Sequence, residues 1–135
     1  MLNGIGGNLG IVLGARISSG LHSGYIEPSM VDDELRDNVN LSLVLGLTIY
    51  VMFTLLIVGA SFAVPLGLHL LKLIPIILIA GGLLTISITV LTVVVTFLSY
   101  HKGLDPDNTV APVVTTTGDF LGITFLIFGI WLVIL

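Results

Sequence analysis

Three long stretches of this chain carry almost no charge, and they restrict its fold more than any other feature. Residues 41–63 and 73–100 contain no Asp, Glu, Lys or Arg, and residues 110–135 contain one acid, Asp119. Each stretch exceeds the roughly 18 to 20 apolar residues with which a helix crosses a bilayer core of about 30 Å. Only 9% of all residues are charged, against about 25% in soluble domains. The sequence therefore predicts an integral membrane protein with little chain left over for a soluble domain.

The N-terminal stretch up to residue 23 is a weaker fourth candidate for a membrane span. It is rich in glycine, and Arg16 lies inside the apolar run. A secretory signal carries its positive charge before the apolar run, so the pattern is not that of a signal peptide. We therefore expect an all-α integral membrane bundle of about four transmembrane helices. One transmembrane domain would cover residues 1–135, with spans at about 3–23, 41–63, 74–99 and 112–135.

Residues 85–96 are rich in Thr, Val and Ile, which in water would favour a β-strand. A strand of an outer-membrane barrel needs only about 9–11 residues, whereas the uncharged run here has 28. A helix also explains the polar residues, because spacings of three and four place them on one face: Thr85, Thr89, Thr92, Thr96 and Ser99. The prolines nearest to the last two spans, Pro75 and Pro112, are expected at span ends, since proline removes a helical hydrogen bond.

Seven of the eight acids fall in the two connections 24–40 and 101–111. If all four segments cross the membrane, these two connections lie on the same side. Arg36 and Lys102 lie on that side and Lys72 on the other, so the positive-inside rule favours the cytoplasm for both connections. We expect a multi-pass protein of the cell membrane.

The composition also excludes several functions. The chain has no cysteine, so disulfide bonds and thiolate chemistry are absent. Its net charge is −4 and it has no basic cluster, so we expect no nucleic-acid partner. The spans show neither a Ser/His pair nor paired carboxylates, so the sequence does not indicate an enzyme, and no organic cofactor is expected.

Asp119 is the residue that most clearly suggests a function. It lies near the middle of the last span, where a carboxylate costs roughly 2.5–3.5 kcal/mol on insertion scales. A bound cation, a buried partner such as Arg16, or protonation would offset that cost. Thr115 and Thr116 lie in the preceding turn, and their oxygens suit a hard cation such as Mg²⁺. We favour an ion site; the alternative is a carboxyl group that holds helices together by hydrogen bonds.

Small residues recur in the first segment at a spacing of four: Gly6, Gly10, Gly14 and Ser18, followed by His22. Gly118 and Gly122 form a similar pair in the last segment. Such stripes allow close helix contacts, and we expect a structural role for them. Asn8 lies off the stripe, and its side chain suits a cation and a neighbouring helix equally well.

Several of these motifs together resemble one family. Residues 6–10 (Gly-Gly-Asn-Leu-Gly) resemble the glycine–asparagine signature of the MgtE family of magnesium transporters and channels. Residues 13–22 are similar to the "SR-L-S-x-L-H" stretch of its archaeal and eukaryotic members. Residues 103–108 and 112–122 match the closing pattern of the family, "G-x-D-P … P-x-x-T-T-x-x-D-x-x-G".

The resemblance implies a divalent-cation path lined by the last helix. It implies that Asp119 is the central Mg²⁺ ligand and that Asn8, Thr115 and Thr116 surround the pore. Asp105 belongs to the closing motif, and we expect its charge at the mouth of the path. Members of the family pair two such domains, as a homodimer or as tandem halves, so the expected partners are the lipid bilayer and a second copy or half.

Family domains have five helices, and the helix before the Gly-Gly-Asn signature has no counterpart in this sequence. We therefore expect a fragment, or a half that needs a partner. The sequence predicts transport of divalent cations, in particular Mg²⁺, through a pore formed by paired domains. The alternative is a non-transporting membrane subunit or assembly scaffold, in which Asp119 and the glycine stripes only hold helices together.

Overall fold

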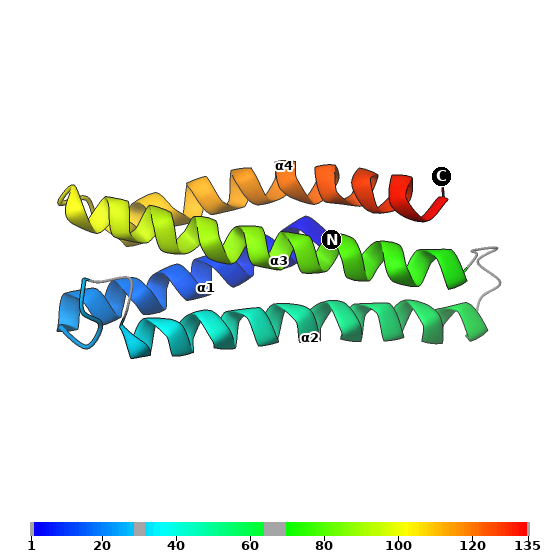
Figure 1. The fold of residues 1–135 in the computed structure, drawn as a ribbon, viewed down its shortest axis with the longest axis horizontal. Coiled ribbons are helices and arrows are strands. Elements are labelled where there is room, and N and C mark those ends of the chain that lie inside the picture. Colours follow the sequence, from blue (N-terminus) through cyan, green and yellow to red (C-terminus); the bar gives the residue numbers. More distant parts are fainter. Residues whose placement is uncertain (1, 29–31, 64–69, 135) are drawn as a thin grey trace.

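The computed structural model describes residues 2–28, 32–63 and 70–134, and in these ranges it contains four helices and no strand. In chain order the helices are α1 (Leu2–Ser23), α2 (Asp33–Ala63), α3 (Leu70–His101) and α4 (Pro106–Ile134). They form an elongated bundle (Figure 1). The predicted all-α architecture is confirmed, and three of the helices, α2, α3 and α4, are long and apolar enough to cross a membrane.

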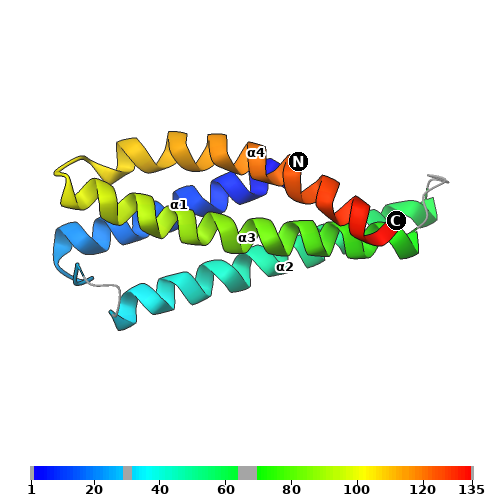
Figure 2. The same ribbon diagram turned by 45° about the horizontal axis from the view of Figure 1, so that its top comes forward.

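The central helix of the bundle is α3, which packs against all three others. Helix α1 also contacts α2 and α4, whereas α2 and α4 do not touch each other in the described part of the chain. Helices α1 and α3 finish, and α2 and α4 begin, at the same end of the bundle, which we call the loop end (Figure 2). The N-terminus lies midway along the bundle, so α1 covers only the half of α3 and α4 nearest to the loop end (Figure 1).

Helices α2 and α4 begin earlier than the predicted spans because capped polar turns extend them beyond their apolar runs. Helix α2 begins after Asp32, whose Oδ1 accepts a hydrogen bond from the Leu35 N–H at 2.9 Å. This is the geometry of a helix N-cap. Helix α4 begins with a proline in its first position after Asp105, whose Oδ1 accepts from the Asp107 N–H at 3.1 Å.

These longer helices contradict the expectation that the prolines mark helix ends. Pro75 lies inside α3 and Pro112 inside α4, although both lie within the first two turns. Each removes one hydrogen bond, to the carbonyl group four residues earlier. Hydropathy located the apolar spans, but it did not show that the helices continue through the polar residues before them.

The glycine stripe of α1 lets it pack tightly against α3 and α4. A Cβ atom on Gly10 would lie 2.8 Å from Thr92 Oγ1, and one on Gly14 would lie 2.6 Å from Val110 Cγ1. Real Cβ atoms almost never come this close to a neighbour, so a larger residue at either position would have to displace the side chains that it meets. The structural role expected for the stripe is therefore confirmed for Gly10 and Gly14, whereas His22 is exposed.

The predicted polar stripe of α3 is also buried, with all five of its members at most 5% exposed. Thr85 Oγ1 donates to the Gly81 carbonyl at 2.9 Å, and Thr96 Oγ1 donates to the Thr92 carbonyl at 2.7 Å. Because these hydroxyl groups bond to their own helix, they can face the other helices without an unsatisfied donor. The stripe thus provides small side chains at the centre of the bundle, although the buried Thr92 hydroxyl group has no hydrogen-bond partner in the described part of the chain.

Replacing Gly10 by Ala is expected to destabilise the bundle by about 1–3 kcal/mol, because the added methyl group would overlap Val114, Ile88 and Thr92. The unfolding midpoint of the detergent-solubilised protein measures this effect. Gly59→Ala is the matched control, since nothing lies within 4 Å of a Cβ atom at Gly59. Equal midpoints for the two variants would contradict the close contact of α1 with α3 and α4.

Replacing Asp32 by Ala is expected to lower the unfolding midpoint at neutral pH and to matter less in acid. The N–H groups of Leu35 and Glu27 donate to this carboxylate and lower the pKa of Asp32. Its stabilisation is therefore complete above the usual Asp pKa of about 3.9 and is lost as the pH falls through the lowered value of the folded state. Thermal unfolding of both proteins between about pH 7 and pH 2.5 measures the difference. Asp33→Ala removes only an exposed ion pair with Arg36, so this control should not lower the unfolding midpoint in a pH-dependent way. If the midpoint difference between the wild type and Asp32→Ala did not change with pH, the capping role would be contradicted.

Candidate cation site

Helices α1 and α4 touch backbone to backbone at one level of the bundle. A Cβ atom on Gly7 would lie 3.4 Å from Thr115 Cγ2, and one on Gly118 would lie 3.7 Å from the Gly7 nitrogen. Two candidate residues follow these glycines directly in the sequence, Asn8 after Gly7 and Asp119 after Gly118. The helix contact therefore places both candidates at the same depth along the bundle.

Three of the predicted site residues lie together on α4. Thr115 is half-buried against Gly7, and Asp119 lies one turn further along, rotated by about 40°. Thr116 and Asp119 are both exposed and are three residues apart, so they share the outer face of α4. The Thr115 hydroxyl donates to the Ala111 carbonyl at 2.8 Å, which leaves its oxygen free to accept or to ligate.

Asn8 lies at the same depth but on another side of α1. It is exposed, and together with Leu9 and Val12 of α1 and Leu45 of α2 it lines a groove of about 320 Å³. Gly7 faces α4, and one residue turns a helix by about 100°, so Asn8 points to the outer surface of α1. The structure thus places Asn8 beside the α4 cluster without bringing it into that cluster.

Asp105 is far from the other four predicted site residues. It precedes α4 at the loop end, and the 14 positions to Asp119 correspond to about 20 Å along the helix. Both of its carboxylate oxygens accept hydrogen bonds, from the Asp107 N–H at 3.1 Å and from Asn108 Nδ2 at 2.8 Å. Asp105 is exposed and caps the helix, so it is not part of the cluster around Asp119.

Arg16 does not lie at the level of Asp119 either. Gly10 packs against Val114 and Gly14 against Val110, so α1 and α4 run past each other in opposite directions. This register separates Arg16 from Asp119 by about 16 Å along the bundle, nearer to the loop end. An Arg16–Asp119 pair within one chain is therefore not what stabilises the carboxylate.

Two apolar side chains of the same helix lie next to Asp119 on the outer surface. Phe120 and Ile123 on the same helix are 70% and 55% exposed. The described residues contain no group of three or more His, Cys, Asp or Glu side chains that could hold a metal ion. The cluster on α4 therefore offers one carboxylate with threonine oxygens, which suits a partly hydrated hard cation better than a closed metal cage.

Sequence reasoning identified Asp119 and its threonines but did not predict that this cluster would lie on the outside of the bundle. The signal was present in the pattern, because the small residues Gly118 and Gly122 mark the face of α4 that packs inward. Asp119 follows the first of these by one position and so falls off that face. Predicting the contact of Gly7 with Thr115 would have required the register of α1 on α4, which the sequence alone does not give.

A bundle with three long apolar helices, and one acid at mid-helix on its outer face, is a helical integral membrane protein with a candidate ion site. The model of the MgtE family, described as divalent cation transporters, matches residues 1–129. The chain belongs to this family of transporters, which is not a class of enzymes. Comparisons with curated proteins and with solved structures gave no match.

Proposed function

We propose that the chain forms half of a Mg²⁺ path across the cell membrane and that a second copy completes the path. The observation that carries this proposal is the position of Asp119, exposed on the outer face of α4 at the middle of a membrane-spanning helix. A carboxylate facing lipid at this depth costs roughly 2.5–3.5 kcal/mol or more. A second copy over this face removes the carboxylate from lipid and lines a path with it.

The geometry favours two-fold pairing of like faces. In a two-fold dimer the same surface of both copies meets, so two Asp119 side chains lie on either side of the axis. Mg²⁺ keeps several waters and binds through one or two carboxylates with further oxygens. Two Asp119 carboxylates with the Thr115 and Thr116 hydroxyl groups provide such a ligand set, and Asn8 adds an amide oxygen at the same depth.

We also propose α1 as a fourth span, so that residues 1–135 form one transmembrane domain. Helix α1 is less hydrophobic than the others, but its glycines lie directly on α3 and α4. A helix packed this closely against two spanning helices shares their depth in the membrane. Its glycine stripe then serves helix packing in lipid.

The acids of the loop end supply the entrance of the path in this proposal. Seven of the eight acids lie at this end, in the connection before α2, in the first turns of α2 and around the start of α4, where Asp105 and Asp107 lie. Their combined field raises the local concentration of divalent cations, and it is screened over about 8 Å at physiological salt. We place this end in the cytoplasm, as the distribution of Lys and Arg favours.

Replacing Asp119 by Asn is expected to abolish divalent flux while the helical content stays unchanged. Asn keeps the shape and one oxygen but loses the charge that offsets dehydration of a divalent ion, where solvent screening is weak. Mg²⁺ uptake into proteoliposomes, measured with an internal indicator dye, tests this. The control Asp107→Asn removes the same charge at the loop end and should reduce flux modestly and only at low salt. Flux of Asp119→Asn at the wild-type level would reject the ion site and favour the scaffold interpretation.

Single cysteines on the outer face of α4 are expected to crosslink two copies in lipid. The chain has no cysteine of its own, so Thr116→Cys and Ile123→Cys each provide one defined thiol. A disulfide requires Cα atoms within about 7 Å, so only residues near the two-fold axis should react. Oxidation in native membranes, followed by non-reducing electrophoresis, measures dimers. Leu56→Cys, on the exposed side of α2, should remain monomeric. Dimers from Leu56→Cys alone would show that the two copies meet through α2 and not through the outer face of α4.

A further inference from the structure

A groove between α1 and α2 has a polar part and an apolar part that suit a phospholipid. Its polar end lies at the loop end of the bundle. This end is a cavity of about 640 Å³ between the second half of α1, the turn that follows it, and the start of α2. Its polar lining consists of Arg16, Ser19, Ser23, Tyr25 and Asn38. These are one cation and four neutral hydrogen-bonding groups, and no carboxylate is among the residues that line the cavity.

The groove continues along the α1–α2 contact towards the middle of the bundle and becomes apolar. Arg16, Val12 and Asn38 also line a narrow space of about 20 Å³, which Leu9 and Leu45 share. Leu9, Val12 and Leu45 in turn line the groove of about 320 Å³ that ends near Ile5. From Arg16 to Ile5 this is about 16 Å along α1, the scale of an acyl chain in one leaflet.

Arg16 is the feature that selects the ligand at the polar end. It is exposed and has no ion pair or hydrogen bond with any other residue that the structure describes. It is also the only Asp, Glu, Lys or Arg between Leu2 and Ile26. A guanidinium group at a membrane helix needs an anion, and its planar fork matches phosphate oxygens in a bidentate manner.

Carboxylates at the outer rim of the cavity add a second requirement. Tyr25 hydrogen-bonds to Glu34, and this bond, together with the nearby charges of Glu34, Asp37 and Asp32, raises the pKa of Tyr25. The rim of the cavity, beyond the place where Arg16 would bind a phosphate group, therefore carries negative charge. A headgroup that carries an amine outside its phosphate complements this order of charges, whereas a purely anionic headgroup is repelled.

We propose that the α1–α2 groove binds a zwitterionic phospholipid of the phosphatidylethanolamine type. Its phosphate lies on Arg16 and Asn38, its amine faces the acids beside Tyr25, and one acyl chain follows the groove past Leu9 and Leu45. A helix of a partner fits less well, because an apolar helix over Arg16 would bury an unpaired guanidinium group. The narrow section between the two wider spaces also admits a single chain better than bulky side chains.

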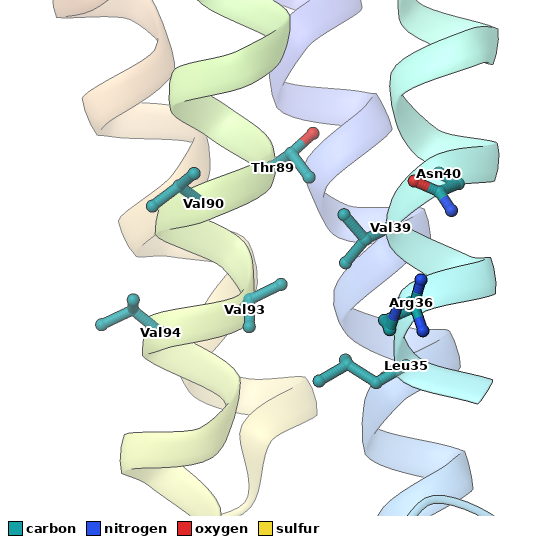
Figure 3. A pocket seen from close by; sticks show the side chains of 8 residues that line it. All are labelled: Leu35, Arg36, Val39, Asn40, Thr89, Val90, Val93 and Val94. Atoms are coloured by element: carbon teal, nitrogen blue, oxygen red, sulfur yellow. The ribbon is translucent and has the colours of Figure 1, made fainter. Parts of the chain in front are cut away.

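A neighbouring groove provides the internal control. Helices α2 and α3 enclose a cavity of about 390 Å³ at the same end of the bundle, with Arg36 at its edge and valines of α3 opposite (Figure 3). There the cation is already paired, because Arg36 Nη1 lies 3.1 Å from Asp33 Oδ1. Arg36→Gln therefore removes a cation at a similar depth, but this cation is not free to bind a phosphate group.

Native mass spectrometry of the whole chain tests the proposal, with phosphatidylethanolamine, phosphatidylglycerol or phosphatidylcholine added to the delipidated protein in detergent. We expect the wild type to retain phosphatidylethanolamine at least about 10-fold better than phosphatidylglycerol, since a difference of this size needs only about 1.4 kcal/mol. Arg16→Gln should lose this retention by a similar factor, and Arg36→Gln should keep it.

Asn38→Leu is a second variant that leaves α1 intact, and it should weaken retention several-fold even if Arg16→Gln does not fold. Equal retention by the wild type, Arg16→Gln and Asn38→Leu would overturn the proposal. Preferred retention of phosphatidylglycerol would overturn the role of the acidic rim. Loss of a dimer in Arg16→Gln, without any lipid retained by the wild type, would instead assign the groove to a second copy.

Discussion

The close packing of the α1 glycines against α3 and α4 is the contact on which the rest of this structure depends. Gly10 and Gly14 leave no room for a Cβ atom, and Gly7 lies against the backbone of α4 at Gly118. In lipid the helices gain no hydrophobic driving force from association, so close packing of this kind must supply much of their attraction. The same contact fixes the register of α1 on α4 and thereby sets the depths of Asn8, Arg16 and Asp119 relative to one another.

That register separates two kinds of polar residue within one short helix. Near its start α1 places Asn8 at the level of Asp119, and near its end it places Arg16 beside the polar turn that leads to α2. The register therefore keeps the Arg16 guanidinium group of α1 and the Asp119 carboxylate of α4 about 16 Å apart along the bundle. At one level these opposite charges would attract each other directly.

Much of the fold could be read from the sequence, because uncharged length is a direct measure of what can cross a bilayer. The three long apolar helices, the buried threonine stripe of α3 and the packing role of the α1 glycines all follow from spacing and polarity. The helix starts could not be read in this way, since Asp32 and Asp105 cap helices that run on through polar residues and enclose Pro75 and Pro112. The candidate site could be predicted only as a set of residue types. That Asp105 caps a helix and that Asn8 lies on another side of α1 than the face that meets α4 depends on three-dimensional arrangement, which hydropathy does not record.

Because α1 is short, the number of helices that support α4 changes along its length. Over the length of α1, α4 packs against both α1 and α3, and beyond the start of α1 the described part of α4 rests on α3 alone, with Gly129 against the Ile76 backbone. A rod clamped on two sides over one half and on one side over the other bends most easily where the support changes. Asp119 lies about one turn before this change of support, because α1 extends from Gly7 to its start at Leu2. Small tilts of the far part of α4 would therefore widen or narrow the space near the carboxylate while the near half stays fixed.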